Sequence, residues 1–201
     1  MPAATSAPSA VRRLDSPAAA ALADLAALFE DLQTVLRCCE RLVSDLAATD
    51  GAPDDLGLEA FWTTALLSYA RCFEPRESGV RLSEEDVRAT GLAGDVVGWH
   101  QMLLRLRAHQ ADPLVNPREL FAVGVSQGDD GTAAGVAVTS TRQPAVDDIT
   151  VRQTGAIAYS LRIVVDTRIG EQQAEVARVA GAMTRAELDQ LPVVSVTLAD
   201  E

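Results

Sequence analysis

Lysine is absent from this chain of 201 residues, and all 17 basic residues are arginine. The absence excludes mechanisms that need a lysine amine, such as Schiff-base formation. Because the chain also carries 29 acidic residues, its net charge at pH 7 is −12. Phosphate attraction needs a basic surface, so this charge disfavours nonspecific nucleic-acid binding without excluding a local basic groove.

Cysteines and long apolar runs are also scarce. The chain has only Cys38, Cys39 and Cys72. Neighbouring cysteines cannot easily bridge each other and an odd number makes a poor disulfide framework, so we expect reduced thiols and a cytoplasmic protein. No run approaches the roughly 18 uncharged apolar residues of a spanning helix, so we expect no membrane association. The sequence VRR at 11–13 resembles part of a twin-arginine export signal, but acidic residues interrupt the apolar segment that should follow.

Apolar residues recur with helical spacing over most of the chain. Ser16 followed by Pro17 is typical of an N-cap and a first helical position, and the alanine-, serine- and proline-rich residues 1–16 are expected to be a disordered tail. Helices are expected at about 17–48, 56–73, 95–110 and 148–182, with short ones after Ser83 and Thr184. One side of the second helix carries an apolar stripe, which predicts a core-facing helix; the stripe is Leu58, Phe61, Trp62, Ala65, Leu66, Tyr69, Cys72 and Phe73.

Two β-rich runs, ELFAVGV and AAGVAVTS, flank the turn-rich segment SQGDDGT. This pattern predicts a β-hairpin at about 119–141 that turns near Asp130 and Gly131. Apolar residues alternate along both runs, as they do in strands with one apolar face. The sequence therefore predicts a mainly α fold: a bundle of four to five helices over residues 17–192, with the hairpin inserted before the last long helix and a C-terminal tail at 193–201.

The helix at 95–110 carries a charged residue where an apolar one is expected. On a helical wheel, His100 and Arg107 are seven residues apart and fall within the same apolar arc. An unpaired buried charge costs several kcal/mol, so Arg107 is expected to have a partner or to line a cleft. His109 falls on the opposite side, so the two histidines cannot share a metal ion.

Two interpretations of this pair are open. In the structural one, Arg107 bonds to loop carbonyls or to Glu119, and His100 is a satisfied core residue. In the functional one, the pair contacts a ligand, a nucleic acid or a second subunit. Tyr69 is expected to bury its ring and to find a hydrogen-bond partner, and a partner near Arg107 would create a polar pocket. The sequence has no glycine-rich phosphate loop and no ligand set for a metal, so we expect no cofactor and no metal.

The segments FWTTALLSYARCF and WHQMLLRLRAHQADPLVNPREL resemble a group of bacterial proteins related to the HEPN superfamily, over roughly residues 17–190. The resemblance implies a helical bundle that commonly dimerises. Because many members are metal-independent endoribonucleases that act as toxins or in phage defence, the resemblance also points to such an activity. It also implies a site of the form Arg-x4–6-His, whose arginine would be Arg107, with Asn116 and Glu119 at matching positions.

The histidine of that motif is missing, because Pro113 stands at its position and His109 comes too early. Metal-independent RNA cleavage needs a proton carrier with a pKa near neutrality, and an arginine stays charged. The sequence therefore predicts a non-catalytic HEPN-like protein that works through association, as a homodimer or with a protein partner, in a toxin–antitoxin or phage-related system. The alternative is a divergent metal-independent endoribonuclease that uses Arg107, His100 and Tyr69.

Overall fold

Helices account for most of the molecule. The computed structural model describes residues 11–48, 54–143 and 146–194. In this part of the chain the fold is mainly α with a β-hairpin before the last long helix, which confirms the predicted fold class. No helix among these residues is long and apolar enough to cross a membrane. The elements are β1 (Val11–Arg12), α1 (Pro17–Ala47), α2 (Asp55–Arg71), α3 (Glu84–Ala89), α4 (Val96–Ala111), β2 (Glu119–Gln127), β3 (Ala133–Arg142), α5 (Asp148–Gly181), α6 (Arg185–Gln190) and β4 (Val193–Val194).

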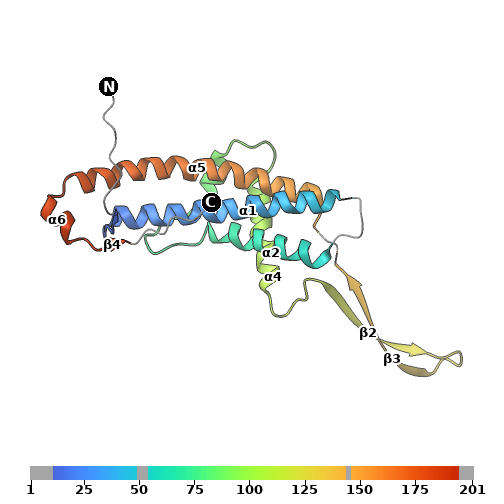
Figure 1. The fold of residues 1–201 in the computed structure, drawn as a ribbon. Coiled ribbons are helices and arrows are strands. Elements are labelled where there is room, and N and C mark those ends of the chain that lie inside the picture. Colours follow the sequence, from blue (N-terminus) through green and yellow to red (C-terminus); the bar gives the residue numbers. More distant parts are fainter. Residues whose placement is uncertain (1–10, 49–53, 144–145, 195–201) are drawn as a thin grey trace.

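The frame of the molecule is the pair of long helices α1 and α5, which lie antiparallel along most of their length (Figure 1). Near one end, the Gln172 side chain donates a hydrogen bond to the Ala18 carbonyl at 3.0 Å. Each fully buried leucine contributes roughly 1.5–3 kcal/mol, so the apolar face of α1 is a large part of what holds the pair together. The buried apolar residues of α1 are Leu25, Leu28, Leu32, Val35, Cys38, Cys39 and Leu42.

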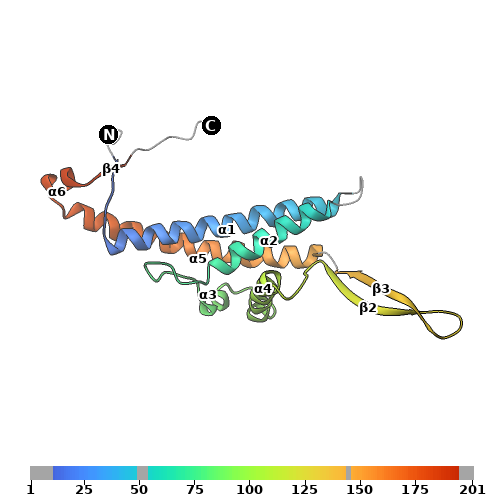
Figure 2. The same ribbon diagram turned by 90° about the horizontal axis from the view of Figure 1, so that it is seen from below.

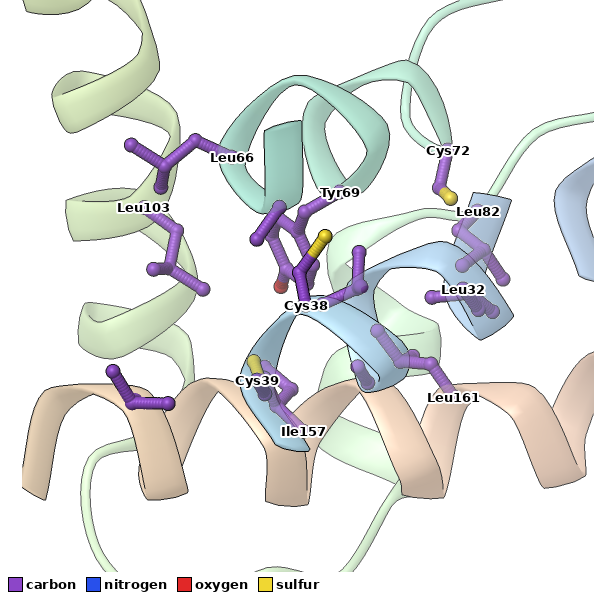
Figure 3. Close-up of a cluster of buried hydrophobic side chains, with 14 of the residues drawn as sticks. Leu32, Cys38, Cys39, Leu66, Tyr69, Cys72, Leu82, Leu103, Ile157 and Leu161 are labelled. Atoms are coloured by element: carbon purple, nitrogen blue, oxygen red, sulfur yellow. The ribbon is translucent and has the colours of Figure 1, made fainter. Parts of the chain in front are cut away.

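The helix α2 runs antiparallel to α1, whereas α4 lies crosswise to both (Figures 1 and 2). Side chains from α1, α2, α4 and α5 meet around Tyr69, where Leu66 of α2 faces Leu103 of α4 (Figure 3). The predicted stripe on the second helix is confirmed as core. Its members are all buried except Phe61 and Phe73, which are partly buried against the same cluster.

Side-chain caps begin the helices where the sequence predicts them. The Ser16 hydroxyl accepts a hydrogen bond from the Ala19 amide at 3.1 Å at the start of α1. Ser83 and Asp86 form a capping box at α3, in which each side chain bonds the backbone amide of the other residue. The same Asp86 carboxylate pairs with Arg168 of α5, so this buried acid both starts α3 and fixes it on the long helix.

The predicted disorder of residues 1–16 needs a correction, because Val11 and Arg12 form a strand with the start of the predicted C-terminal tail. β1 and β4 pair antiparallel, with Val11 opposite Val194. The Arg12 guanidinium donates hydrogen bonds to the carbonyls of Asp189 and Leu191, both at 2.9 Å. The two strands meet because α1 begins beside the end of α5, which brings the two ends of the described chain together (Figure 1). Such a contact between distant segments is not visible in the local sequence. The rest of the predicted tails, residues 1–10 and 195–201, lies outside the described residues.

The hairpin of β2 and β3 extends away from the helices, beyond the end of the α1–α5 pair (Figure 2). The strands pair antiparallel from Glu119 opposite Arg142 to Gln127 opposite Ala133. The turn falls where the sequence predicts it, and Gly131 supplies the positive φ of +79° that the turn requires. Every residue of both strands is exposed except Glu119, which is half-buried, so the hairpin packs on nothing along most of its length.

We expect Asp86→Ala to lower the free energy of unfolding by about 2–3 kcal/mol, because it removes a helix cap and the partner of Arg168 together. Urea denaturation followed by circular dichroism measures the change. The matched control is Glu84→Ala on the same helix, whose ion pair with Arg88 is exposed and should contribute less than about 0.5 kcal/mol. Equal effects of the two substitutions would contradict this account of α3.

Candidate functional site

A buried pair of polar rings lies where α2 and α4 cross. Tyr69 is fully buried and His100 is 4% exposed, and the Tyr69 hydroxyl lies 2.9 Å from Nδ1 of His100. Phe73 covers the imidazole, with the two ring centroids 4.3 Å apart. This contact confirms that the Tyr69 hydroxyl has a buried partner, and the partner is His100.

Burial sets the ionisation of both groups. It lowers the pKa of His100 below its ordinary value of 6.5, an effect that the nearby Glu84 partly opposes. It also raises the pKa of Tyr69, and the neighbouring Cys72 adds to that shift. The pair is therefore neutral at pH 7, and the arrangement that satisfies both groups has the hydroxyl donating to an unprotonated Nδ1. Such a pair joins α2 to α4 and is poorly placed to exchange protons with a substrate.

Arg107 does not share the buried position of His100. Its side chain is exposed, although the helical wheel places Arg107 in the same apolar arc as His100, so this arc is not buried along its whole length. Along α4, which lies crosswise to α2 (Figure 1), the last fully buried residue is Leu103, and Leu104 and Leu106 beyond it are only partly buried against the core. A helical wheel gives the direction in which a side chain points and not how far the neighbouring helices extend. In the described part of the chain no carboxylate pairs with Arg107, and the acids nearest the hairpin pair with other arginines.

Asn116 and Glu119, which the resemblance places in a binding site, lie at the start of the hairpin. The Asn116 side-chain oxygen accepts hydrogen bonds from the backbone amides of Arg118 at 2.9 Å and of Glu119 at 3.2 Å. This side chain therefore shapes the turn that leads into β2, as asparagine commonly does before a strand. Glu119 is the first residue of β2 and faces Arg142 across the hairpin. A binding role for either residue stays a prediction.

A depression of about 400 Å³ lies at the base of the hairpin, with Trp62 among its lining residues. Arg118 donates to Glu59 at 2.8 Å, and Arg142 donates to Asp55 at 2.5 Å. Both arginines belong to the base of the hairpin and both acids to the first turns of α2, so the two ion pairs tie the hairpin to that helix. Sequence reasoning missed these four residues, because the partners are 59 and 87 positions apart and no local pattern links them.

The three cysteines are buried and unpaired by disulfides. Burial raises the pKa of the Cys39 thiol and of the Cys72 thiol to about 12 in each case. Thiols with such values are not nucleophiles at neutral pH. Among the described residues, no group of three or more histidines, cysteines and acids is placed to hold a metal ion.

No protein family, curated protein or solved structure matches this chain. The relationship to the HEPN superfamily therefore stays a prediction that rests on the short motifs around Arg107 and Asn116. The side chains relevant to function are a buried neutral histidine, an exposed arginine, and the two ion pairs that hold the hairpin.

We expect the protein to lose stability as the pH falls below about 6.5, by up to about 1.4 kcal/mol for each pH unit. The sign follows from His100: its pKa is lowered in the folded state, so below 6.5 the unfolded chain takes up a proton that the folded chain does not. Urea denaturation at intervals between pH 7.5 and 5 measures the slope.

The variant His100→Gln should lose most of this slope. The control His109→Gln changes an exposed histidine on the same helix and should keep it. If His100→Gln and the unmodified protein had the same slope in this range, the buried imidazole would not be its source.

We expect Arg107→Ala to change the free energy of unfolding by less than about 0.5 kcal/mol, because the side chain is exposed. Tyr69→Phe leaves a buried Nδ1 without its partner and should cost about 1–3 kcal/mol. Thermal or urea unfolding of both variants compares them directly. A loss on Arg107→Ala as large as that on Tyr69→Phe would restore the structural interpretation of the arginine.

Proposed function

We propose that this protein is non-catalytic and acts through protein association, as a homodimer. The observation that carries the proposal is the apolar face of the hairpin, which nothing in the described structure covers. Its large side chains are 57–75% exposed. We define the hairpin apolar face by these residues: Phe121, Val123, Val125, Val136 and Val138.

A two-stranded hairpin is at best marginally stable in water by itself. Stability requires more strands with a shared apolar face, or a helix packed on the hairpin. Here both strands have a free outer edge, because β2 and β3 form a sheet of two. Exposed apolar surface and unpaired strand edges are the features by which proteins bind other chains. Association supplies the missing cover, so the exposed hairpin supports an interaction protein.

The alternative function, a divergent metal-independent endoribonuclease that uses Arg107, His100 and Tyr69, receives less support. An exposed arginine is able to stabilise a phosphorane, but it does not shuttle protons. The candidate proton carrier His100 is enclosed by Tyr69 and Phe73, and its pKa is lowered by burial. Reaction would require RNA to reach an imidazole that solvent barely reaches, on a chain with a net charge of −12.

The biological system in which the protein would act is inferred from the resemblance alone. A HEPN-like protein that has lost the motif histidine would work by binding, in a toxin–antitoxin or phage-defence system of the cytoplasm. In that setting the hairpin would hold two copies together.

Two measurements on the purified protein separate these functions. Sedimentation equilibrium between low micromolar and high micromolar concentrations should give the mass of a dimer. Incubation with RNA in the presence of a chelator should give no cleavage, either by the unmodified protein or by Arg107→Ala. A monomer at every concentration would contradict association. Cleavage that is lost in both Arg107→Ala and His100→Gln would favour the nuclease.

A further inference from the structure

A second pocket lies between α4 and α5, and it shares no lining residue with the depression at the base of the hairpin. Its walls come from the loop before α4, from the first ten residues of α4 and from residues 153–157 of α5. The volume is about 500 Å³. Small-molecule sites commonly measure roughly 300–1,000 Å³ and occur between the helices of bundles. The pocket is therefore large enough for a compact organic molecule.

The walls of this pocket are mainly apolar. Leu92, Val96 and Trp99 are partly buried against the core. The Ile157 side chain of α5 is 1% exposed, whereas Met102, one helical turn after Trp99, is 41% exposed. An indole ring and a thioether both make favourable contacts with aromatic rings. These walls therefore favour the aromatic part of a ligand.

A guanidinium without a partner lies at one edge of the pocket. Arg105 lines the pocket and is exposed, and it follows Met102 by one helical turn, so its charge is beside the apolar wall. In the described part of the chain no carboxylate pairs with Arg105, whereas Arg152 of α5 pairs with Asp148 at 2.7 Å. A guanidinium binds a carboxylate through two parallel hydrogen bonds, which gives this edge a preference for an acid.

The acidic residue of the pocket does not neutralise Arg105. The Asp95 carboxylate accepts a hydrogen bond from the Gly98 amide at 2.8 Å and so caps the start of α4. Asp95 precedes Arg105 by ten positions, which corresponds to about 15 Å along the helix at 1.5 Å per residue. Of the described residues that line the pocket, Arg105 is therefore the one whose charge is free.

A hydrogen-bond donor in the pocket wall also lacks a partner. The indole Nε1 of Trp99 is buried, and no acceptor among the described residues bonds to it. Buried donors in folded proteins almost always have a partner, so an unpaired one calls for an explanation. Trp99 as a whole is only half-buried, so a small rotation of its ring turns the N–H toward the pocket. A ligand in the pocket is a source of the missing acceptor.

We propose that this pocket binds an aromatic carboxylate, with its ring against Trp99 and Met102 and its carboxylate on Arg105. A neutral aromatic molecule would leave the guanidinium without a partner, and an aliphatic acid would lose the contacts of its ring with the indole and the thioether. The inference goes beyond the proposed function, because it assigns a small-molecule ligand to the helical bundle. It does not depend on the hairpin or on the oligomeric state.

Titration of the purified protein with 2-naphthoate tests the site, followed through the indole N–H signals in heteronuclear NMR spectra. The chain has two tryptophans, Trp62 and Trp99, so two such signals are expected, and the variant Trp99→Phe assigns them. The Trp99 signal should shift in a saturable way. The Trp62 signal should stay in place, because Trp62 lines the depression at the hairpin base and not this pocket.

Removal of one charge at a time tests the contact with Arg105. Arg105→Gln should raise the dissociation constant for 2-naphthoate at least about fivefold. The control Arg81→Gln removes an exposed arginine outside the pocket and should change the constant less than about twofold. The neutral probe 2-naphthamide should bind the unmodified protein at least about fivefold more weakly than 2-naphthoate, and Arg105→Gln should not weaken it further.

A substitution that fills the pocket tests its position. Ala156 of α5 lines the pocket and is exposed, so Ala156→Phe should occupy the space of the ligand and abolish the shift of the Trp99 signal. Circular dichroism should show unchanged helix content, because the side chain is outside the core. Arg105→Gln keeps the test decisive if Ala156→Phe does not fold.

A saturable shift at Trp99 that weakens in Arg105→Gln and not in Arg81→Gln supports the inference. No saturable shift at millimolar 2-naphthoate would overturn it, as would a shift at Trp62 alone, which would place the probe at the hairpin base. Equal weakening by Arg105→Gln and Arg81→Gln would show an effect of net charge and would overturn the contact with Arg105. Octanoate that binds as tightly as 2-naphthoate would overturn the preference for an aromatic ring.

Discussion

The antiparallel packing of α1 against α5 is the constraint on which the rest of the structure depends. It fixes where the two ends of the described chain meet, and β1 and β4 pair there. It also gives α2 an apolar surface on which to pack, and α4 then crosses that layer, with Leu103 as its last fully buried residue. From the end of α4 the chain continues into the hairpin, which extends beyond the end of the long helices (Figures 1 and 2). The exposed position of the hairpin is thus a consequence of how the helices pack.

The same geometry divides the residues that the sequence grouped as one site. His100 lies in the buried part of α4, where Tyr69 satisfies its Nδ1, and burial favours the neutral imidazole. Arg107 lies two turns further along, where no helix covers it. RNA cleavage would require the phosphate bound by Arg107 and the proton carrier His100 to lie at one place. Here the exposed arginine and the buried histidine are separated by the edge of the core. A catalytic histidine needs access to substrate and a pKa near neutrality, whereas a structural histidine needs burial and a hydrogen-bond partner. The surroundings of His100 are those of a structural histidine.

The sequence predicts local structure well, because local structure follows from neighbouring residues. Ser16, Ser83 and Thr184 are caps at the positions their spacing indicates, and the stripe around Tyr69 faces the core. The sequence does not predict contacts between segments that lie far apart in the chain. Nothing near Arg118 or Arg142 indicates a partner 59 or 87 positions away, and nothing near Val11 indicates a strand partner at Val194. The helical wheel did not predict the exposure of Arg107 for the same reason. Burial depends on which helices lie nearby as well as on the direction of the side chain.

The central claim is that the hairpin apolar face is covered by a second copy of the chain. Amide hydrogen exchange at several protein concentrations tests it most directly, because it reports on the strands themselves. Residues 119–142 should exchange more slowly as the concentration rises through the dimer dissociation constant, while the amides of the α1–α5 pair should not change. Exchange of the hairpin amides at a rate independent of concentration, over a range in which the protein is shown to dimerise, would contradict the claim.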